Sequence, residues 1–423
     1  MNFIEELRWR GMIHDMTPGL EDHLRDNQIK GYIGFDPTAP SLTIGNYVQI
    51  MLLTLFQRHG HTPVVLMGGA TGRIGDPSFK DTERELKSED EIQKNLEHQE
   101  RQFRSLLNFE SGINKAIMLN NYEFYHEMKV LDFLRDVGKT LTVNYMMSKE
   151  SVKKRIETGL SFTEFSYQLL QGYDFQVLLE KYGVTLQMGG SDQWGNITAG
   201  TEFIRRNTGQ KAYALTSPLL VKADGTKFGK STEGNIWLDP NLTSPYQFYQ
   251  FWINGDDRDT HRFIKIFSLK PVGELEAWLK EESDPRILKK ELAEELTIRI
   301  HGRDEFESVL KVSELLFNPK INQEFVRSLS EKELQRIAAE IPTFSIPRSM
   351  VEGRTFVDVA VGPDRVFSSN GEARRAIKGN AVSVNKEKIG DFEYQIQSDD
   401  LLFGKYILLE NGKKNKFIVQ VEN

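Results

Sequence analysis

The chain has 423 residues, of which 39% are hydrophobic and 27% charged, and its net charge is −7. This composition is typical of a globular protein with two or three domains, and the negative balance argues against indiscriminate binding of nucleic acids. The absence of cysteine excludes disulfides, thiolate metal sites and cysteine nucleophiles.

Residues 1–239 alternate short apolar runs with helical segments. Residues 1–10 are amphipathic and of mixed charge, unlike a signal peptide, and no apolar run is long enough to cross a bilayer, so we expect a cytoplasmic protein. Strands are predicted at 31–35, 63–67, 116–119, 184–188 and 215–221, with helices between them, among them 47–58 and 89–107. This alternation predicts an α/β fold with a doubly wound parallel, Rossmann-like sheet, in which ligands bind beyond the carboxyl ends of the strands.

The segment 37–46, which follows the first predicted strand, is small, polar and rich in hydroxyl groups. Gly45 starts a helix there, so free N–H groups and the helix dipole favour an anion. Thr38, Thr43 and Asn46 can each donate a hydrogen bond. An ordinary corner between a strand and a helix, with a threonine N-cap, explains the segment about equally well when it is taken alone.

The glycine-rich segment 68–76 does not have the spacing of a dinucleotide fingerprint, and its Asp76 suits a substrate cation better than a phosphate. Residues 161–164 predict a capping box that begins a helix ending near residue 182. Tyr167, Gln171 and Asp174 share one face of that helix. A partly exposed polar stripe is the plainer interpretation of this face, and a pocket for amine and hydroxyl groups is the alternative. After the next strand, Asp192 can cap a helix or hold a ribose hydroxyl.

The segment 222–231 carries three lysines and two glycines. Lys222, Lys227 and Lys230 suit a triphosphate whose charge moves during a reaction. With the segment 37–46, this loop would grip a nucleotide triphosphate from two sides while the α-phosphate is attacked. A solvated hairpin is the alternative, because Asp224-Gly225 is a strong turn signal. The chain lacks a P-loop motif, which disfavours P-loop kinases and ATPases.

Three further parts are predicted after the first domain at 1–239. Helical periodicity over 240–338 predicts a helical domain, and two prolines without helical pattern predict a linker at 339–350. Residues 351–423 predict a small α+β module. Basic residues predominate between residues 365 and 388, so a basic patch can lie on an acidic protein.

These segments together resemble the bacterial tyrosyl-tRNA synthetases, which are class I aminoacyl-tRNA synthetases, over nearly the whole chain. The most specific stretches are residues 32–39, 68–77, 161–175, 189–200 and 227–231. Residues 43–46 correspond to the "HIGH" signature and residues 227–231 to the "KMSKS" signature. The family usually has histidine where this chain has Thr43 and Asn46. That form is similar to the one in tryptophanyl-tRNA synthetases, which makes a tryptophan enzyme the nearest alternative, although the pairing of Tyr32 with Asp174 favours tyrosine.

The resemblance implies a cytoplasmic tyrosine–tRNA ligase that forms tyrosyl-adenylate from L-tyrosine and ATP and then transfers tyrosine to the 3′ end of its tRNA. It implies a homodimer, which the apolar region 124–147 could serve, Mg²⁺ brought by ATP without a dedicated metal site, and a C-terminal S4-type RNA-binding domain. An RNA-binding protein that kept the fold and lost the chemistry is the alternative of a different class.

The resemblance also implies roles for individual residues. The tyrosine-binding residues would be Tyr32, Asp76, Tyr167, Gln171, Asp174 and Gln193. The ATP-binding residues would be Asp36, Gly45, Gly190, Asp192 and Lys230. The groups that stabilise charge during catalysis would be Thr38, Thr43, Asn46, Lys227, Lys230 and Ser231. The RNA-binding residues would be Arg374, Arg375 and Lys378.

Overall fold

The computed structural model describes residues 1–78, 87–149, 152–153, 155–156, 159–231, 234–412 and 415–422. They form two compact units, residues 1–301 and 302–423. The helices predicted as one domain over 240–338 are therefore shared between the two units. In the described residues, no helix combines the length and the apolar character that crossing a bilayer requires.

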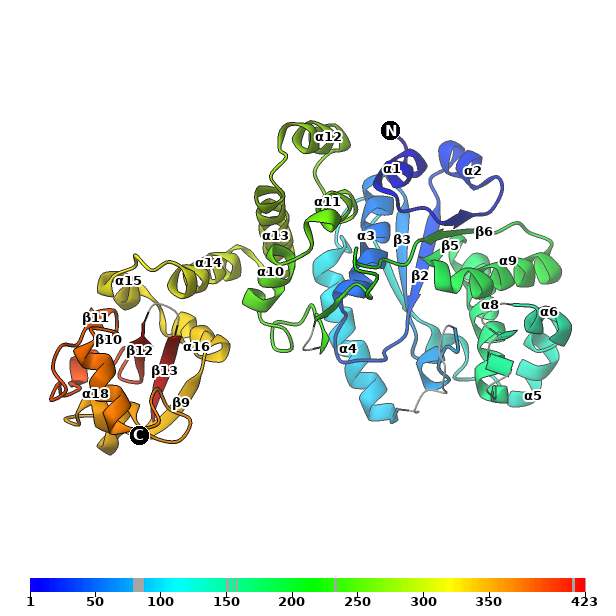
Figure 1. Cartoon of the computed structure of the whole chain (residues 1–423). Coiled ribbons are helices and arrows are strands. Elements are labelled where there is room, and N and C mark those ends of the chain that lie inside the picture. Colours follow the sequence, from blue (N-terminus) through cyan, green and yellow to red (C-terminus); the bar gives the residue numbers. More distant parts are fainter. Residues whose placement is uncertain are drawn as a thin grey trace. The chain divides into compact units, whose positions relative to one another are not determined.

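The first unit is built on a six-stranded sheet with the strand order β1-β6-β5-β2-β3-β4 (Figure 1). Its strands are β1 (Asp15–Met16), β2 (Lys30–Phe35), β3 (Thr62–Met67), β4 (Ile117–Asn120), β5 (Val184–Gly190) and β6 (Tyr213–Ser217). The strands from β2 to β6 are parallel, and β1 is an antiparallel edge strand. The predicted α/β fold with a doubly wound parallel sheet is confirmed.

The prediction of a strand over 215–221 is wrong at its end. β6 stops at Ser217 because Pro218 follows, and proline has no N–H to donate to a ladder. Residues 218–221 instead run along the cavity described below. The short strand β1 was not predicted, since two residues carry too little pattern to be recognised.

Helices cover both faces of this sheet (Figure 1). The four long ones are α3 (Ile44–Arg58), α4 (Glu89–Leu106), α8 (Phe162–Tyr182) and α9 (Trp194–Thr208). On the face of α8 and α9, a buried cluster joins Tyr32 and Val64 of the sheet to Phe175 and Leu178 of α8 and Ile204 of α9. Apolar residues on both faces explain why the strands read as continuous hydrophobic runs.

Helix α8 has the boundaries that its sequence predicts. Ser161 accepts a hydrogen bond from the backbone N–H of Glu164 at 3.2 Å. Gly183 ends the helix with φ of +68°, a left-handed conformation that glycine adopts without strain. These two caps fix where α8 begins and ends, and its apolar residues Phe175 and Leu178 fix which face meets the sheet.

The remaining α-helices of the first unit whose bounds are described are α1 (Phe3–Arg10), α2 (Leu20–Asp26), α5 (Val130–Asp132), α6 (Val143–Met147), α10 (Pro245–Ile253), α11 (Thr260–Phe267), α12 (Val272–Glu281) and α13 (Pro285–His301). The lysine-rich loop ends in the short strand β7 (Lys230–Ser231), which pairs with β8 (Gly234–Asn235).

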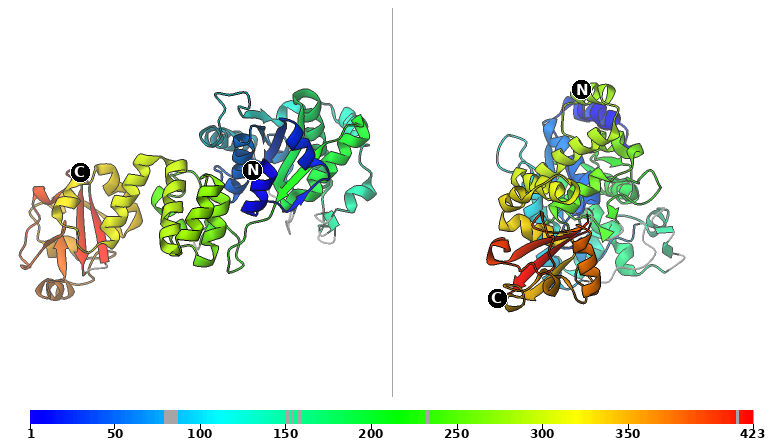
Figure 2. Two further views of the ribbon diagram at one scale, coloured as in Figure 1. Left: turned by 90° about the horizontal axis from the view of Figure 1, so that it is seen from above. Right: turned by 60° about the vertical axis from the view of Figure 1, so that its left-hand side comes forward.

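The second unit begins with α14 (Arg303–Phe317), α15 (Gln323–Ser328) and α16 (Glu331–Glu340). A five-stranded sheet follows, in the order β11-β10-β12-β13-β9. Its strands are β9 (Thr343–Pro347), β10 (Val382–Val384), β11 (Glu387–Lys388), β12 (Tyr406–Asn411) and β13 (Asn415–Glu422). β12 and β13, coloured red, run side by side in each view (Figures 1 and 2). Helices α17 (Phe356–Ala360) and α18 (Asn370–Lys378) complete the predicted α+β module.

The prediction of a linker over 339–350 is wrong at residues 343–347. They form β9, which pairs in parallel with β13 at the edge of the sheet. An edge strand tolerates proline because one side of its backbone needs no ladder partner. The two prolines that suggest a linker thus stand before and at the end of an edge strand.

Candidate active site

A cavity of about 730 Å³ opens at the carboxyl ends of β2 and β5. These neighbouring strands have their next partners on opposite sides, which is the switch point where parallel sheets bind ligands. The predicted site residues that line it are Tyr32, Asp36, Thr38, Thr43, Gly45, Asn46, Asp76, Tyr167, Gln171, Asp174, Gly190, Asp192, Gln193, Lys227 and Lys230. The structure therefore brings them together. The side chain of Ser231 lies outside the described part of the chain.

The floor of the cavity holds a buried carboxylate, Asp174, which is 2% exposed. The side-chain amide of Asn121 donates to one of its oxygens at 2.9 Å, and the hydroxyl of Tyr125 donates to the other at 2.7 Å. Burial raises the pKa of Asp174 to about 7, whereas the hydrogen bonds from Asn121 and Tyr125 act to lower it, and the negative charge of Asp36 adds to the rise. Two donors thus hold in place a carboxylate that burial alone would disfavour.

Five buried polar atoms of residues that line the cavity have no hydrogen-bond partner within the described structure, among them the side-chain carbonyl oxygens of Gln49 and Gln99. The other three lie at the floor. They are the hydroxyl of Tyr32 and the side-chain carbonyl oxygens of Gln171 and Gln187. An unsatisfied buried polar atom costs about 1–3 kcal/mol. The floor therefore suits a ligand that brings a hydroxyl and further donors, such as an ammonium group, close to these atoms.

A second carboxylate, Asp36, lies just beyond the end of β2. It accepts hydrogen bonds from the hydroxyl of Thr71 at 2.7 Å and from that of Tyr167 at 2.9 Å. A Cβ atom at Gly68 would lie 2.2 Å from its Oδ1. Only glycine permits this approach, so the glycine-rich segment after β3 acts here by bringing backbone close to Asp36.

The third acidic group, Asp76, is connected to the start of α9. It accepts from the side-chain amide of Gln193 at 2.6 Å, from that of Asn196 at 3.3 Å and from the backbone N–H of Ser78 at 2.9 Å. Burial raises the pKa of nearby Asp192, and the charge of Asp76 adds to this effect. The carboxylates of Asp36, Asp76, Asp174 and Asp192, which all line the cavity, therefore form one acidic region that attracts a cation.

The first turn of α3 faces the mouth of the cavity. The hydroxyl of Thr43 donates to Oδ1 of Asn46 at 2.8 Å and accepts from the backbone N–H of Asn46 at 3.3 Å. Thr43 is thus the N-cap that one interpretation of the sequence predicts, and it also orients the Asn46 amide. With its oxygen held by Thr43, Asn46 keeps its NH₂ group as a donor toward the cavity.

The lysine-rich loop forms the opposite side of the mouth. It is the hairpin that Asp224-Gly225 predicts, since Val221 bridges Lys227 and Gly225 has φ of +82°. Lys227 and Lys230 are exposed and line the cavity. Lys222 has a different part, because its amino group donates to the backbone carbonyl of Lys230 at 2.8 Å and so braces the hairpin.

Sequence reasoning missed several polar residues of the site. They are Thr71, Asn121, Tyr125, Gln187 and Asn196. Only Asn121 carried a usable signal, since it follows the end of a predicted parallel strand. Within the described residues, no group of three or more His, Asp or Glu side chains is arranged to hold a metal ion.

A basic surface lies in the second unit. Arg374, Arg375 and Lys378 are exposed on α18. The guanidinium of Arg374 lies 5.5 Å from the ring centroid of Phe392, which is 47% exposed. Closely spaced cations beside an exposed aromatic ring suit a nucleic-acid strand, because they offer phosphate contacts and a stacking face.

Two protein-family models match this chain. The family model described as "tRNA synthetases class I (W and Y)" matches residues 24–318. The model described as "Tyrosine--tRNA ligase SYY-like C-terminal domain" matches residues 333–419.

Full-length relatives and solved structures extend this match. The chain is 52% identical to a tyrosine–tRNA ligase of Cytophaga hutchinsonii over 99% of both chains, and 50% identical to one of Bacteroides fragilis over 99% of both. A C-terminally truncated mitochondrial tyrosyl-tRNA synthetase of Aspergillus nidulans superposes with a TM-score of 0.67 at 30% identity. That superposition covers 75% of this chain and 94% of the other.

The environment of Asp174 predicts a carboxyl pKa that can be measured and that depends on its hydrogen bonds. Its pKa in the folded protein is raised from 3.8 to about 7, so its contribution to the free energy of unfolding falls as pH rises from about 4 to about 7 and is constant above. Tyr125→Phe should raise this pKa by about one further unit, since it removes a hydrogen bond of about 1 kcal/mol.

Carbon-13 NMR of labelled aspartate checks this prediction, with Asp174→Asn to assign the signal. Tyr173→Phe is the matched control, because its ring packs against Tyr125 at 5.6 Å and the change removes a hydroxyl from the same surroundings. An identical Asp174 titration in Tyr125→Phe and the unmodified chain would contradict the prediction.

Proposed function

The chain belongs to the class I tRNA synthetase family for tryptophan and tyrosine, in its tyrosine–tRNA ligase branch, and we propose that its cavity is where L-tyrosine is activated with ATP and passed to tRNA. The observation that carries the assignment of the cavity is the unsatisfied polar floor. A phenol both donates and accepts a hydrogen bond, so it can donate to Asp174 while accepting from Tyr32. The indole of tryptophan only donates, and it would leave the Tyr32 hydroxyl without an acceptor.

The rest of the amino acid fits the acidic region beside the floor. The ammonium group would lie near Asp76, Gln171 and Tyr167, where a buried carbonyl oxygen of Gln171 lacks a donor. Gln193, which donates to Asp76 at 2.6 Å, would lie near the substrate carboxylate. That carboxylate then points toward the mouth, where the phosphates enter.

The first reaction step needs no general base, because the substrate carboxylate is already a nucleophile. It attacks the α-phosphate of ATP, and pyrophosphate leaves. Catalysis then rests on placing the two reactants and on donors aimed at the developing charge. We assign that role to the NH₂ group of Asn46, to Thr38, Lys227, Lys230 and Ser231, with Thr43 holding Asn46 in position.

The nucleotide would occupy the space between α3 and β5. Gly45 supplies backbone from the first turn of α3, where N–H groups lack helical partners. Asp36, Gly190 and Asp192 would contact the adenosine part, and Lys230 the phosphates. Mg²⁺ would arrive on the phosphates and keep most of its waters. In the second step, the terminal ribose hydroxyl of tRNA attacks the adenylate carbonyl and releases AMP.

The cytoplasm is the compartment we infer for this reaction, because ATP, tyrosine and tRNA meet there. The basic residues of α18 are proposed to bind tRNA. In support, all three are exposed and could form phosphate contacts, which supply much of the affinity for RNA.

The homodimer is proposed to form through an apolar patch on α5, on α6 and on the short π-helix Phe133–Val137 between them. The patch consists of Val130, Leu131, Leu134, Val143 and Met147, which are 74%, 78%, 48%, 58% and 41% exposed. Exposed apolar side chains in such number on neighbouring segments are uncommon on a monomer and typical of an interface.

The activity is tested by ATP–pyrophosphate exchange. Exchange should depend on L-tyrosine, and phenylalanine should support it about a hundredfold less well or worse, because it leaves Tyr32 and Asp174 unpaired. Tyr32→Phe should reduce this preference about tenfold, as measured by the ratio of kcat/KM values. Tyr213→Phe, whose ring stacks on His23 away from the cavity, should keep the preference. No tyrosine-dependent exchange in the unmodified chain would refute the proposed function.

The role of the second unit is tested by a chain that ends at residue 301. It keeps every described residue that lines the cavity, so it should form tyrosyl-adenylate at near-normal rates. It should charge tRNA poorly, and the full-length variant with Arg374, Arg375 and Lys378 all changed to alanine should share the defect. Charging by the intact chain should also weaken with added salt, by about 0.7–0.9 in logarithmic slope for each phosphate contact. Equal charging by all three proteins across a salt series would contradict the RNA-binding role.

The dimer is tested by sedimentation equilibrium. Leu131→Asp places a charge at the most exposed position of the apolar patch and should shift the protein to monomers, because an unpaired charge is costly to bury at an interface. Ile113→Asp is a control, since Ile113 is also exposed, at 87%, but lies outside the patch. A Leu131→Asp variant that remains dimeric would rule out this patch as the interface.

A further inference from the structure

The lysine-rich loop is attached by its backbone to helix α11. The buried carboxylate of Asp259, at the start of α11, accepts a hydrogen bond from the N–H of Ala223 at 2.8 Å. Arg262, one turn into the helix, donates to the carbonyl of Val221. Residues 221–223 are therefore fixed to the N-terminal end of α11, and the hairpin extends from that base.

The ring of Phe228 provides a second attachment. Phe228 is 3% exposed, although Lys227 and Lys230 on either side are exposed. Its centroid lies 5.1 Å from that of Phe263 and 5.4 Å from that of Phe267, both on α11, and 6.1 Å from that of Trp252 on α10. The loop thus buries one aromatic ring between the two lysines that line the cavity.

The residue after Phe228 brings the loop against α3. Gly229 has φ of +84°, and a Cβ there would lie 3.0 Å from Cγ2 of Ile44 and 3.2 Å from the backbone nitrogen of Gly45. No other residue fits this approach without displacing the first turn of α3. Because Gly229 follows the buried Phe228 directly, the position of the Phe228 ring also determines how the loop lies against α3. It therefore sets where the lysines stand relative to Asn46.

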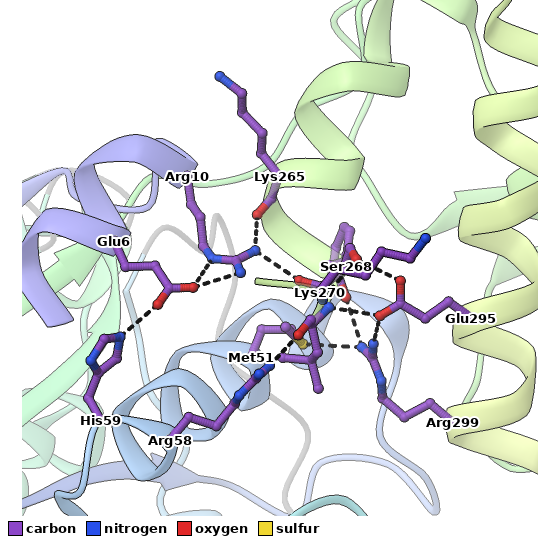
Figure 3. Close-up of polar contacts among 12 residues, drawn as sticks. Glu6, Arg10, Met51, Arg58, His59, Lys265, Ser268, Lys270, Glu295 and Arg299 are labelled. Atoms are coloured by element: carbon purple, nitrogen blue, oxygen red, sulfur yellow. Dashed lines mark hydrogen bonds and ion pairs between the residues drawn. The ribbon is translucent and has the colours of Figure 1, made fainter. Parts of the chain in front are cut away.

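Helix α11 is itself held at its C-terminal end by three arginines from three elements (Figure 3). Arg10 of α1 donates to the carbonyl of Ser268 at 2.9 Å, Arg299 of α13 donates to that of Phe267 at 2.8 Å, and Arg58 of α3 donates to that of Leu269. Cations at this end satisfy carbonyls that lack helical partners and oppose the helix dipole. Helix α11, on which Phe228 packs, is thus held by hydrogen bonds from three other helices.

One of these arginines also connects α11 to the helix that carries Asn46. Arg299 donates to the hydroxyl of Tyr47 at 3.2 Å. The Tyr47 ring is nearly parallel to that of Phe267, with an interplanar angle of 5° and centroids 6.1 Å apart. Phe267 therefore contacts Phe228 on one side and Tyr47, next to Asn46, on the other.

We propose that Phe228 is a positioning residue for adenylate formation: it anchors the lysine loop to α11, and α11 holds that loop at a fixed place opposite the first turn of α3. The proposal rests on the proposed function of the cavity. The charges themselves sit on Lys227 and Lys230, and Phe228 acts only through them. Loss of the ring should leave the tyrosine floor intact, because the hydrogen bonds and ring contacts described for Asp174 and Tyr32 are made with Asn121, Tyr125 and Phe175.

The first test compares Phe228→Ala and Phe228→Leu with the unmodified chain. Phe228→Ala should lower kcat of pyrophosphate exchange on the order of tenfold to a hundredfold, since a misplaced catalytic group costs about that much, while the Kd of tyrosine stays within about twofold. Phe228→Leu should recover most of the rate. Phe248→Leu is the matched control: Phe248 is also buried and its ring also contacts Trp252, but its other ring partner is His301 and not the loop. It should leave kcat near normal.

A double-mutant cycle with Lys230→Ala separates positioning from loss of stability. If Phe228 acts through the lysines, Phe228→Ala should cost at least about threefold less in the Lys230→Ala background than in the unmodified chain. Phe228→Val, which removes the ring and leaves a small apolar side chain, gives the same comparison in both backgrounds if the alanine variant does not fold. Equal losses in both backgrounds, or a normal kcat in Phe228→Ala, would overturn the proposal. Absence of tyrosine-dependent exchange in the unmodified chain would instead refute the proposed function.

Discussion

A carboxylate in a dry pocket is stable only where donors surround it, and the site of this protein is arranged around that constraint. Asp174 lies on the inward face of α8 and is held by Asn121 from the end of β4 and by Tyr125 just after it. Ionisation is still opposed by burial, which raises the pKa of Asp174 to about 7. A neighbouring hydroxyl, that of Tyr32, has no partner. A ligand hydroxyl that enters between them would give the Tyr32 hydroxyl a partner, and in the proposed function this links polar satisfaction to the choice of substrate.

The parallel sheet makes this arrangement possible. β2 and β5 end side by side at its switch point, so segments far apart in the sequence meet there: residues 36–46, 68–78, 167–174 and 190–193. The floor is built on packed helices and strands. The lysines, in contrast, stand on a hairpin that is attached to α11. In the proposed function, selection of the amino acid and stabilisation of the moving charge therefore belong to two differently supported parts of one cavity.

The sequence predicts most of what local pattern and capping determine. Helix α8 begins after Ser161 and ends before Gly183, as expected, because both caps are encoded next to the helix itself. Proline was harder to interpret. Pro218 ends a strand earlier than hydrophobicity suggests, and Pro347 stands at the end of an edge strand rather than in a linker. In each case the outcome depends on the ladder partners, which the local sequence does not specify.

The site was predictable as a set of segments but not as a set of contacts. The polar face of α8 was visible from spacing, and family resemblance supplied its expected ligand. Tyr125 carried no pattern, because its role arises only when the end of β4 packs beside α8. The sequence predicted Thr43 as a possible helix N-cap. It did not predict that the Thr43 hydroxyl orients the Asn46 amide, because that depends on side-chain geometry. Tertiary contact decides such roles, and periodicity does not encode it.

The most direct measurement of the central claim is a crystal structure of the chain with L-tyrosine bound. The account predicts the phenol oxygen within hydrogen-bond distance of both the Tyr32 hydroxyl and the Asp174 carboxylate, with the ammonium group beside Gln171 and Asp76 and the carboxylate toward Asn46. A bound tyrosine whose phenol points to the mouth of the cavity, with Tyr32 still lacking a partner, would contradict it.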